Sequence, residues 1–160
     1  MEENVYTEEQ QNLFDTEVLY TEASQGQRFL NFIIDNLFMR YALSYASGYA
    51  VGYILLAVAP DFLAEVAFDE RGWRFWTLAY ILSIFNYIIY YTICEKAFKG
   101  YTLGKLLTGT RAIRNDGAEL TFKDAILRSL SRLVPFEPFS ALGGTPWHDT
   151  WTKTTVIKAR

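Results

Sequence analysis

The chain alternates between long apolar runs and charged segments. Two runs carry no charged residue, namely Tyr41–Ala59 with nineteen residues and Phe75–Cys94 with twenty. An α-helix rises about 1.5 Å per residue, so roughly twenty apolar residues cross the hydrocarbon core of a bilayer. Neither run has the polar stripe that is typical of a helix in a soluble bundle. The pattern therefore predicts two transmembrane helices, over about 29–59 and 73–94, rather than two buried helices of a soluble protein.

Charged residues are concentrated outside these two runs. Seven acidic residues precede Arg28 and eleven of the fifteen basic residues follow Cys94, which explains a mean hydropathy of only +0.03. The first 24 residues contain no Lys or Arg, so they lack the basic start of a secretory signal peptide. We expect residues 1–24 to form an acidic, mobile tail and residues 25–160 to form one membrane domain.

The distribution of Lys and Arg predicts the orientation in the membrane. The connection between the two helices, PDFLAEVAFDERG, has one Arg and four acidic residues, whereas several basic residues follow the second helix closely. Loops rich in Lys and Arg stay in the cytoplasm. We therefore expect a multi-pass protein with both termini in the cytoplasm and its helices in contact with the lipid bilayer.

The segment after the second helix changes character. Asn115-Asp116-Gly117 is a strong turn signal, and it predicts a small β-hairpin over about 105–121. Thr121 and Asp124 resemble a capping box, and an amphipathic helix over about 122–134 follows, with Arg128 and Arg132 on its charged face. Residues 133–147 are too short and too rich in proline for a third span, which leaves an interfacial or a re-entrant segment. The closing TKTTVIKAR predicts a strand that pairs with the hairpin. The expected fold is thus an all-α membrane protein with a small β-hairpin.

The first membrane helix carries small residues at helical spacing. Ser44, Gly48 and Gly52 recur every four residues, a spacing that lets two helix backbones approach closely. The partner is either the second helix of the same chain, where Asn86 offers an interhelical hydrogen bond, or a second copy in a homo-oligomer.

Several weak motifs together give the domain a family resemblance. The first helix contributes Arg28 and Asp35, and the segment after the second helix contributes a G-K-x-x-x-G pattern and an NDG turn. An arginine pair and a terminal His-Asp followed by K-T-x-V complete the set. Besides the NDG turn, the residues are Arg28, Asp35, Gly104, Lys105, Gly109, Arg128, Arg132, His148, Asp149, Lys153, Thr154 and Val156. In order and spacing, residues 24–160 resemble the RDD family of small bacterial membrane proteins. The resemblance places the naming arginine and two aspartates at Arg28, Asp35 and Asp149, here called the polar centre. It implies a location in the bacterial inner membrane, and transport is suggested for the family.

Arg28 and Asp35 share one face of the first helix, about 10 Å apart along its axis, with Asn31 between them. A short carboxylate that enters the membrane must be paired, hydrated or protonated. Three hypotheses follow, and the first is structural. In it, Arg28 binds Asp149, or Asp35 binds Arg128 or Arg132, and these pairs clamp the cytoplasmic segment to the first helix.

The second hypothesis is transport. Asp35 would exchange a proton for a monovalent cation, with Asp149 and Asn86 as accessory ligands, within an oligomer or with a membrane protein partner. The third is an accessory subunit whose basic face binds anionic lipid or a partner protein.

Enzymatic chemistry finds no support in the sequence. His148 is the single histidine, and the chain has no phosphate-binding loop, nucleophile motif or metal-ligand spacing. We expect His148 to orient a turn and expect no cofactor. Nucleic-acid binding is also disfavoured, because the net charge is −3 and the basic residues lie next to the membrane.

Overall fold

The computed structural model describes residues 20–69, 72–140 and 143–160. Most of the expected mobile tail, residues 1–19, lies outside the described residues. In chain order the elements are α2 (Gln25–Phe38), the π-helical segment η1 (Met39–Leu43), α3 (Ser44–Val58), α4 (Pro60–Phe68), α5 (Trp73–Ala97), α6 (Leu103–Thr108), β1 (Thr110–Arg114), α7 (Phe122–Ser131), α8 (Glu137–Ser140), α9 (Trp147–Thr152) and β2 (Thr154–Lys158).

The first apolar segment forms one continuous helix, Gln25–Val58, of 34 residues. Ser24 caps it, since its side chain accepts a hydrogen bond from the Gln27 backbone while the Gln27 side chain accepts one from Ser24. At 1.5 Å per residue the helix is about 51 Å long, well beyond a hydrocarbon core of about 30 Å. It is therefore long enough to extend out of the membrane at one end.

The two parts of this helix differ in burial. No residue of α3 is buried, as expected for a helix that faces lipid, whereas α2 buries Asn31 and Asp35 against the rest of the chain. The π-helical η1 joins them, and its Met39 packs against Tyr90 and Tyr91 of α5. Arg28 and Asp35 thus belong to the part of the helix that packs on the protein.

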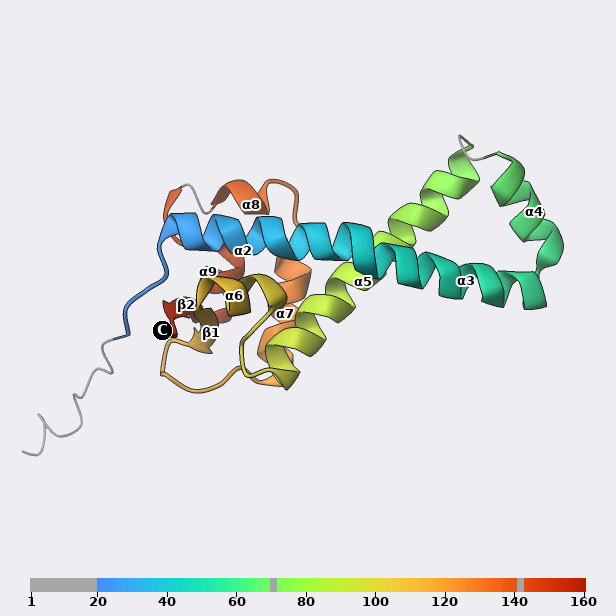
Figure 1. Cartoon of the computed structure of the whole chain (residues 1–160). Coiled ribbons are helices and arrows are strands. Elements are labelled where there is room, and N and C mark those ends of the chain that lie inside the picture. The colour runs from blue at the N-terminus through green and yellow to red at the C-terminus, as the bar shows by residue number, and fades with distance from the viewer. Residues whose placement is uncertain (1–19, 70–71, 141–142) are drawn as a thin grey trace, which may run out of the picture.

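The second candidate span, α5, shows the same division. All of its buried residues lie in its C-terminal half, from Asn86 to Glu95. Figure 1 shows α3 and the N-terminal half of α5 extending away from the other elements, with α4 near their far ends. The helix α4 was not expected, because its sequence reads as a short connection. By length and composition, Gln25–Val58 and Trp73–Ala97 can both cross a membrane.

A two-stranded antiparallel sheet closes the opposite end of the molecule. β1 pairs with β2 in a register that sets Ala112 opposite Val156. Glu22 forms an additional bridge to Ile157, and the Ala23 amide donates to the Val156 carbonyl at 2.9 Å. The start of the described chain and its last strand therefore lie side by side.

The expected hairpin over about 105–121 is wrong in its pairing. The turn forms, with Gly117 at φ +82° and its amide donating to Arg114, but the residues after it make no strand. Residues 105–108 belong to α6, and the partner of β1 is the distant β2. The residues after the turn are used elsewhere: Leu120 is buried in the core next to the sheet, and Thr121 caps α7, so too few residues remain for a second strand.

The charged face of α7 also differs from expectation. Thr121 and Asp124 form a reciprocal capping box, and the helix ends at Ser131 rather than near residue 134. Arg128 is fully buried, whereas the apolar Phe122 and Leu130 are exposed. The orientation follows from ion pairing, because Arg128 meets carboxylates of α5 and α9 inside the protein. Burying a charge without such partners would be prohibitive.

Candidate functional site

Asp149 joins three elements through its two carboxylate oxygens. Oδ2 accepts a hydrogen bond from Arg28 of α2, and Oδ1 accepts one from Arg128 of α7 at 2.5 Å. The carboxylate has no solvent exposure, and Arg28 is only 10% exposed. Arg28 additionally donates to the Val156 carbonyl at 3.3 Å and to Thr155 at 3.4 Å. One aspartate thus ties the start of the first helix to α7, α9 and β2.

Glu95 is a second buried acidic residue, and the sequence reasoning missed it. It lies near the C-terminal end of α5 and is fully buried. Its carboxylate accepts from Lys105 at 2.5 Å, from Arg132 at 2.8 Å and from Arg128 at 2.9 Å. Because Arg128 binds Asp149 as well, the ion pairs are continuous; the buried network consists of Arg28, Glu95, Lys105, Arg128, Arg132 and Asp149.

Asp35 has a different environment from the rest of the polar centre. Its carboxylate accepts hydrogen bonds, each 2.7 Å long, from Thr102, Tyr90 and the Gly104 amide. It is 1% exposed, and none of the described residues forms a salt bridge with it. The expected pairing of Asp35 with Arg128 or Arg132 is therefore wrong. Both arginines use Glu95 instead, while Asp35 caps the N-terminus of α6.

The close approach of α2 and α6 depends on Gly104. A Cβ atom at this position would lie 2.4 Å from the Asn31 carbonyl oxygen. Asn31 itself is buried and donates to Thr110 at 3.0 Å while accepting from Thr108 at 2.5 Å. The glycine of the G-K-x-x-x-G segment thus lets Asp35 reach the Gly104 amide.

The remaining accessory residues divide between two regions. Asn86 donates to Ser47 at 2.7 Å, which joins α5 to α3, and it therefore does not accompany Asp35. His148 Nδ1 is hydrogen-bonded to Glu137, and its Nε2 lies 3.4 Å from Asp149. His148 thus connects α8 with the buried network, a larger role than the turn that was expected for it.

Burial and charge act against each other on the groups outside the two long helices. Burial alone would raise the pKa of Asp149, but the surrounding groups, Arg128 first and Arg28 among the others, together outweigh it and hold the pKa well below its usual range. Burial, and after it the charge of Arg132, lowers the pKa of His148 to about 4. Burial also lowers the pKa of Lys105 to about 8, although the Glu95 carboxylate acts in the opposite direction. At pH 7 Asp149 and most of Lys105 are therefore charged, and His148 is neutral.

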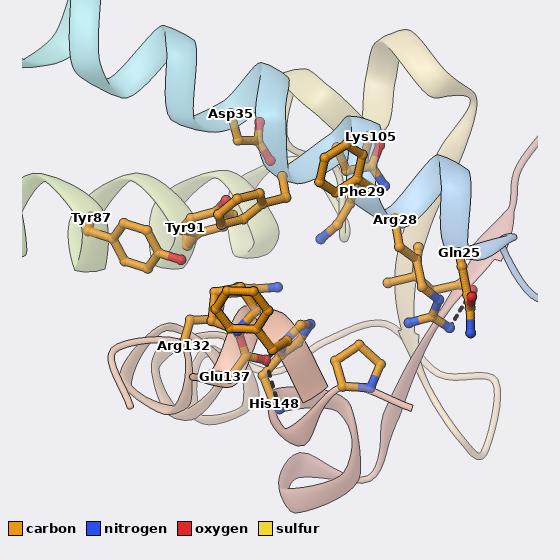
Figure 2. A pocket seen from close by; sticks show the side chains of 16 residues that line it. Gln25, Arg28, Phe29, Asp35, Tyr87, Tyr91, Lys105, Arg132, Glu137 and His148 are labelled. Atoms are coloured by element: carbon orange, nitrogen blue, oxygen red, sulfur yellow. Dashed lines mark hydrogen bonds and ion pairs between the residues drawn. The ribbon is translucent and has the colours of Figure 1, made fainter. Parts of the chain in front are cut away.

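A cavity of about 430 Å³ lies beside the network. It is enclosed by the N-terminal part of the first helix, the C-terminal half of α5 and the segment around α8. Figure 2 shows Arg132 beside Tyr91, with Glu137 and His148 nearby and Phe29 and Lys105 across the cavity. Asp35 also lines it. The walls are mainly apolar, which is typical of a pocket for a small organic molecule.

The structure brings together most of the residues that the sequence singled out, but in two sites. Arg28, Arg128, Arg132, His148 and Asp149 belong to or contact the buried network, whereas Asp35 and Asn31 hold α6. Glu95 carried one sequence signal that could have revealed it, since it is a single acid directly after twenty uncharged residues. Over the three described ranges, no group of three or more His, Cys, Asp or Glu side chains could hold a metal ion.

Comparison with known proteins gives one match. Residues 22–155 match the RDD family, and the match covers both long helices, the buried network and the first two residues of β2. No curated protein and no solved structure matches the chain.

Proposed function

Because the chain belongs to the RDD family, we propose that it is a non-enzymatic membrane protein whose buried network clamps the segment after α5 to the two membrane helices. In this proposal the polar centre is organising rather than catalytic. The two apolar helices cross the bilayer, and the lipid is the protein's main surroundings.

The observation that carries the proposal is the position of Asp149. It is fully buried and holds Arg28 of the first helix and Arg128 of α7 at the same time. An acid placed to exchange ions with solvent would be expected to have an unpaired oxygen, whereas both oxygens of Asp149 are bound to arginines. A carboxylate held by two guanidinium groups is well suited to fixing the relative position of helices.

We place the protein in the bacterial inner membrane with both termini in the cytoplasm. The start of the described chain pairs with β2, so these segments share one side of the membrane. Lys96, Lys99 and Lys105 follow the second span on that side, and such residues favour the cytoplasm.

A second candidate function is cation/proton exchange at Asp35, and one observation favours it. Asp35 is buried, lines the cavity and is bound only by neutral donors in the described part of the chain. Two spans cannot enclose a pathway, so exchange requires a second copy or a membrane protein partner. Gly48 and Gly52 offer a surface for it, because a Cβ at either position would meet nothing within 4 Å.

Proton flux in vesicles tests both candidates. The protein is reconstituted in lipid vesicles, a Na⁺ or K⁺ gradient is imposed, and internal pH is followed for wild type, Asp35→Asn and Asp149→Asn at matched amounts of folded protein. Glu65→Gln is the control, since Glu65 forms an exposed ion pair with Arg74 far from the network.

The two candidates predict different results. The clamp predicts that Asp149→Asn lowers the yield and thermal stability of folded protein, and that wild type shows no cation-dependent flux. Flux in wild type that disappears in folded Asp35→Asn protein would establish exchange instead. An Asp149→Asn protein as stable as Glu65→Gln would refute the clamp.

A further inference from the structure

The cavity of about 430 Å³ is lined mainly by apolar side chains, together with charged side chains that include Arg132 and Lys105. Its apolar residues include Phe29 of α2 and Phe139 of α8, whose side chains are both largely exposed at the molecular surface. Asp35 and Tyr87 line it from the ends of the two long helices that pack on the rest of the chain, and the other lining residues come from α6, from residues 132–148 and from β2. In a bilayer crossed by these two candidate helices, their ends lie near the boundary between acyl chains and head groups, so a cavity at these ends is within reach of lipid-like molecules.

One cation in the cavity wall has unused hydrogen-bond donors. Arg132 is 7% exposed, and its Nη2 donates to Glu95 at 2.8 Å. The face of its guanidinium lies over the Tyr91 ring, 4.3 Å from the ring centre. Its Nη1 is buried and finds no hydrogen-bond partner among the described residues. A buried guanidinium nitrogen without an acceptor is costly, so this site favours an anion.

The other charged groups of the cavity already have partners. Arg28 binds Asp149, Lys105 binds Glu95, and Glu137 binds His148. Asp35 also lines the cavity, and its carboxylate accepts hydrogen bonds from Tyr90, Thr102 and the Gly104 amide. Arg128 also has an unpartnered nitrogen, but Arg128 does not line the cavity. Among the described residues that line the cavity, Arg132 therefore carries the buried side-chain nitrogen that lacks a hydrogen-bond partner.

We propose that this cavity binds an amphiphilic anion, a molecule with one acyl chain and one carboxylate or phosphate head. The head group is recognised by Arg132 Nη1, and the acyl chain lies along the apolar wall near Phe29 and Phe139. Nη1 is shielded from solvent, so the head group reaches it when neighbouring side chains move aside. The inference does not depend on the clamp or on ion exchange, because it concerns a molecule that enters from the bilayer.

Direct binding tests the proposal. The full-length protein is placed in nanodiscs of uncharged phosphatidylcholine, and binding of radiolabelled dodecanoate is measured. Competitors are dodecyl phosphate, which has the same chain with a phosphate head; dodecanol, which has no charge; and inorganic phosphate, which has no chain. We expect saturable binding of one dodecanoate per chain, effective competition by dodecyl phosphate, and at least tenfold weaker competition by dodecanol and by inorganic phosphate.

Variants locate the site. Arg132→Gln is expected to weaken binding at least tenfold. Arg132→Gln also disturbs the buried network, so a second pair of variants, which leaves the network intact, is needed. Phe139→Glu places a negative charge at the cavity and weakens binding, whereas Phe136→Glu serves as the control. Phe136 is equally exposed on the same segment but does not line the cavity, so its substitution leaves binding unchanged. Equal competition by dodecanol, competition by inorganic phosphate at similar concentration, or equal effects of Phe139→Glu and Phe136→Glu would overturn the proposal.

Discussion

Arg28 and Asp149, which stand 121 positions apart in the chain, form a buried ion pair between α2 and α9. Arg128 holds the other oxygen of the same carboxylate, so the aspartate serves two guanidinium groups at once. Removing the charge of Asp149 leaves both arginines without a counterion in a buried place, which explains why it is the most informative position to change.

We predict that Asp149→Asn destabilises the folded protein by about 3–5 kcal/mol, the usual cost of removing one partner of a buried ion pair. The measurement is thermal unfolding in detergent. Glu65→Gln, which removes an exposed pair, should cost roughly 0–1 kcal/mol. Equal unfolding midpoints for the two variants would show that the buried ion pair does not contribute more to stability than the exposed pair.

Glu95→Gln should be at least as damaging, because Lys105, Arg128 and Arg132 all lose their shared anion. The double variant Glu95→Gln with Lys105→Met removes one cation along with the anion. We expect it to recover part of the lost stability, measured as a coupling energy in a double-mutant cycle. Additive losses would mean that Lys105 and Glu95 act independently.

Asp35 should respond differently from Asp149, because its partners are neutral. Asp35→Asn keeps an oxygen for Tyr90 and the Gly104 amide, so we expect a loss of about 1–2 kcal/mol. Asp35→Ala leaves all three donors unsatisfied and should cost about 3–5 kcal/mol. Chemical unfolding of both variants checks the order, and an Asn variant as unstable as Ala would show that the charge itself is required.

Gly104→Ala should force α6 away from α2, since the added Cβ would lie 2.4 Å from the Asn31 carbonyl oxygen and 2.9 Å from its Cα. Backbone atoms cannot rotate aside, so we expect a loss of about 1–3 kcal/mol or more. Gly48→Ala is the matched control, because its Cβ meets nothing within 4 Å. The two unfolding midpoints should differ clearly; matching midpoints would contradict the tight packing.

Acid should destabilise the protein in two stages. The pKa of His148 is lowered from 6.5 to about 4, so the unfolded chain binds its proton first and stability falls as the pH drops through this interval. The full shift corresponds to about 3 kcal/mol. The pKa of Asp149 is also lowered, because Arg128 and the other groups around it together outweigh burial, and its contribution is lost at still lower pH. Unfolding midpoints between about pH 7.5 and pH 2 test both stages, and His148→Gln should flatten the upper part of the profile.

Local patterns in the sequence predicted the long helices, the NDG turn and the capping box of α7, because each depends on residues that are close in the chain. The pairing of β1 with β2 was partly predicted, since the closing segment was expected to be a strand. The predicted hairpin is wrong because Thr121 caps α7 and because Leu120 is buried against Ala23 and Val156, a contact that only the tertiary fold reveals.

The site was predictable to a similar extent. Charge and family resemblance identified Arg28 and Asp149, and they do meet. The buried side of α7 was missed because Arg128 looks like a solvent-facing residue until Glu95 and Asp149 are placed next to it. Glu95 was missed because a single acid at the end of an apolar run also fits an ordinary helix terminus.

The long separation of Arg28 and Asp149 also bears on biosynthesis. At roughly 5–20 residues per second, a ribosome needs about 6–25 s to make the 121 positions between them. During that time both long helices can enter the bilayer while Arg28 still lacks its counterion. In the proposed clamp, insertion of the two helices therefore comes first, and the segment after α5 locks onto them only once Asp149 has left the ribosome.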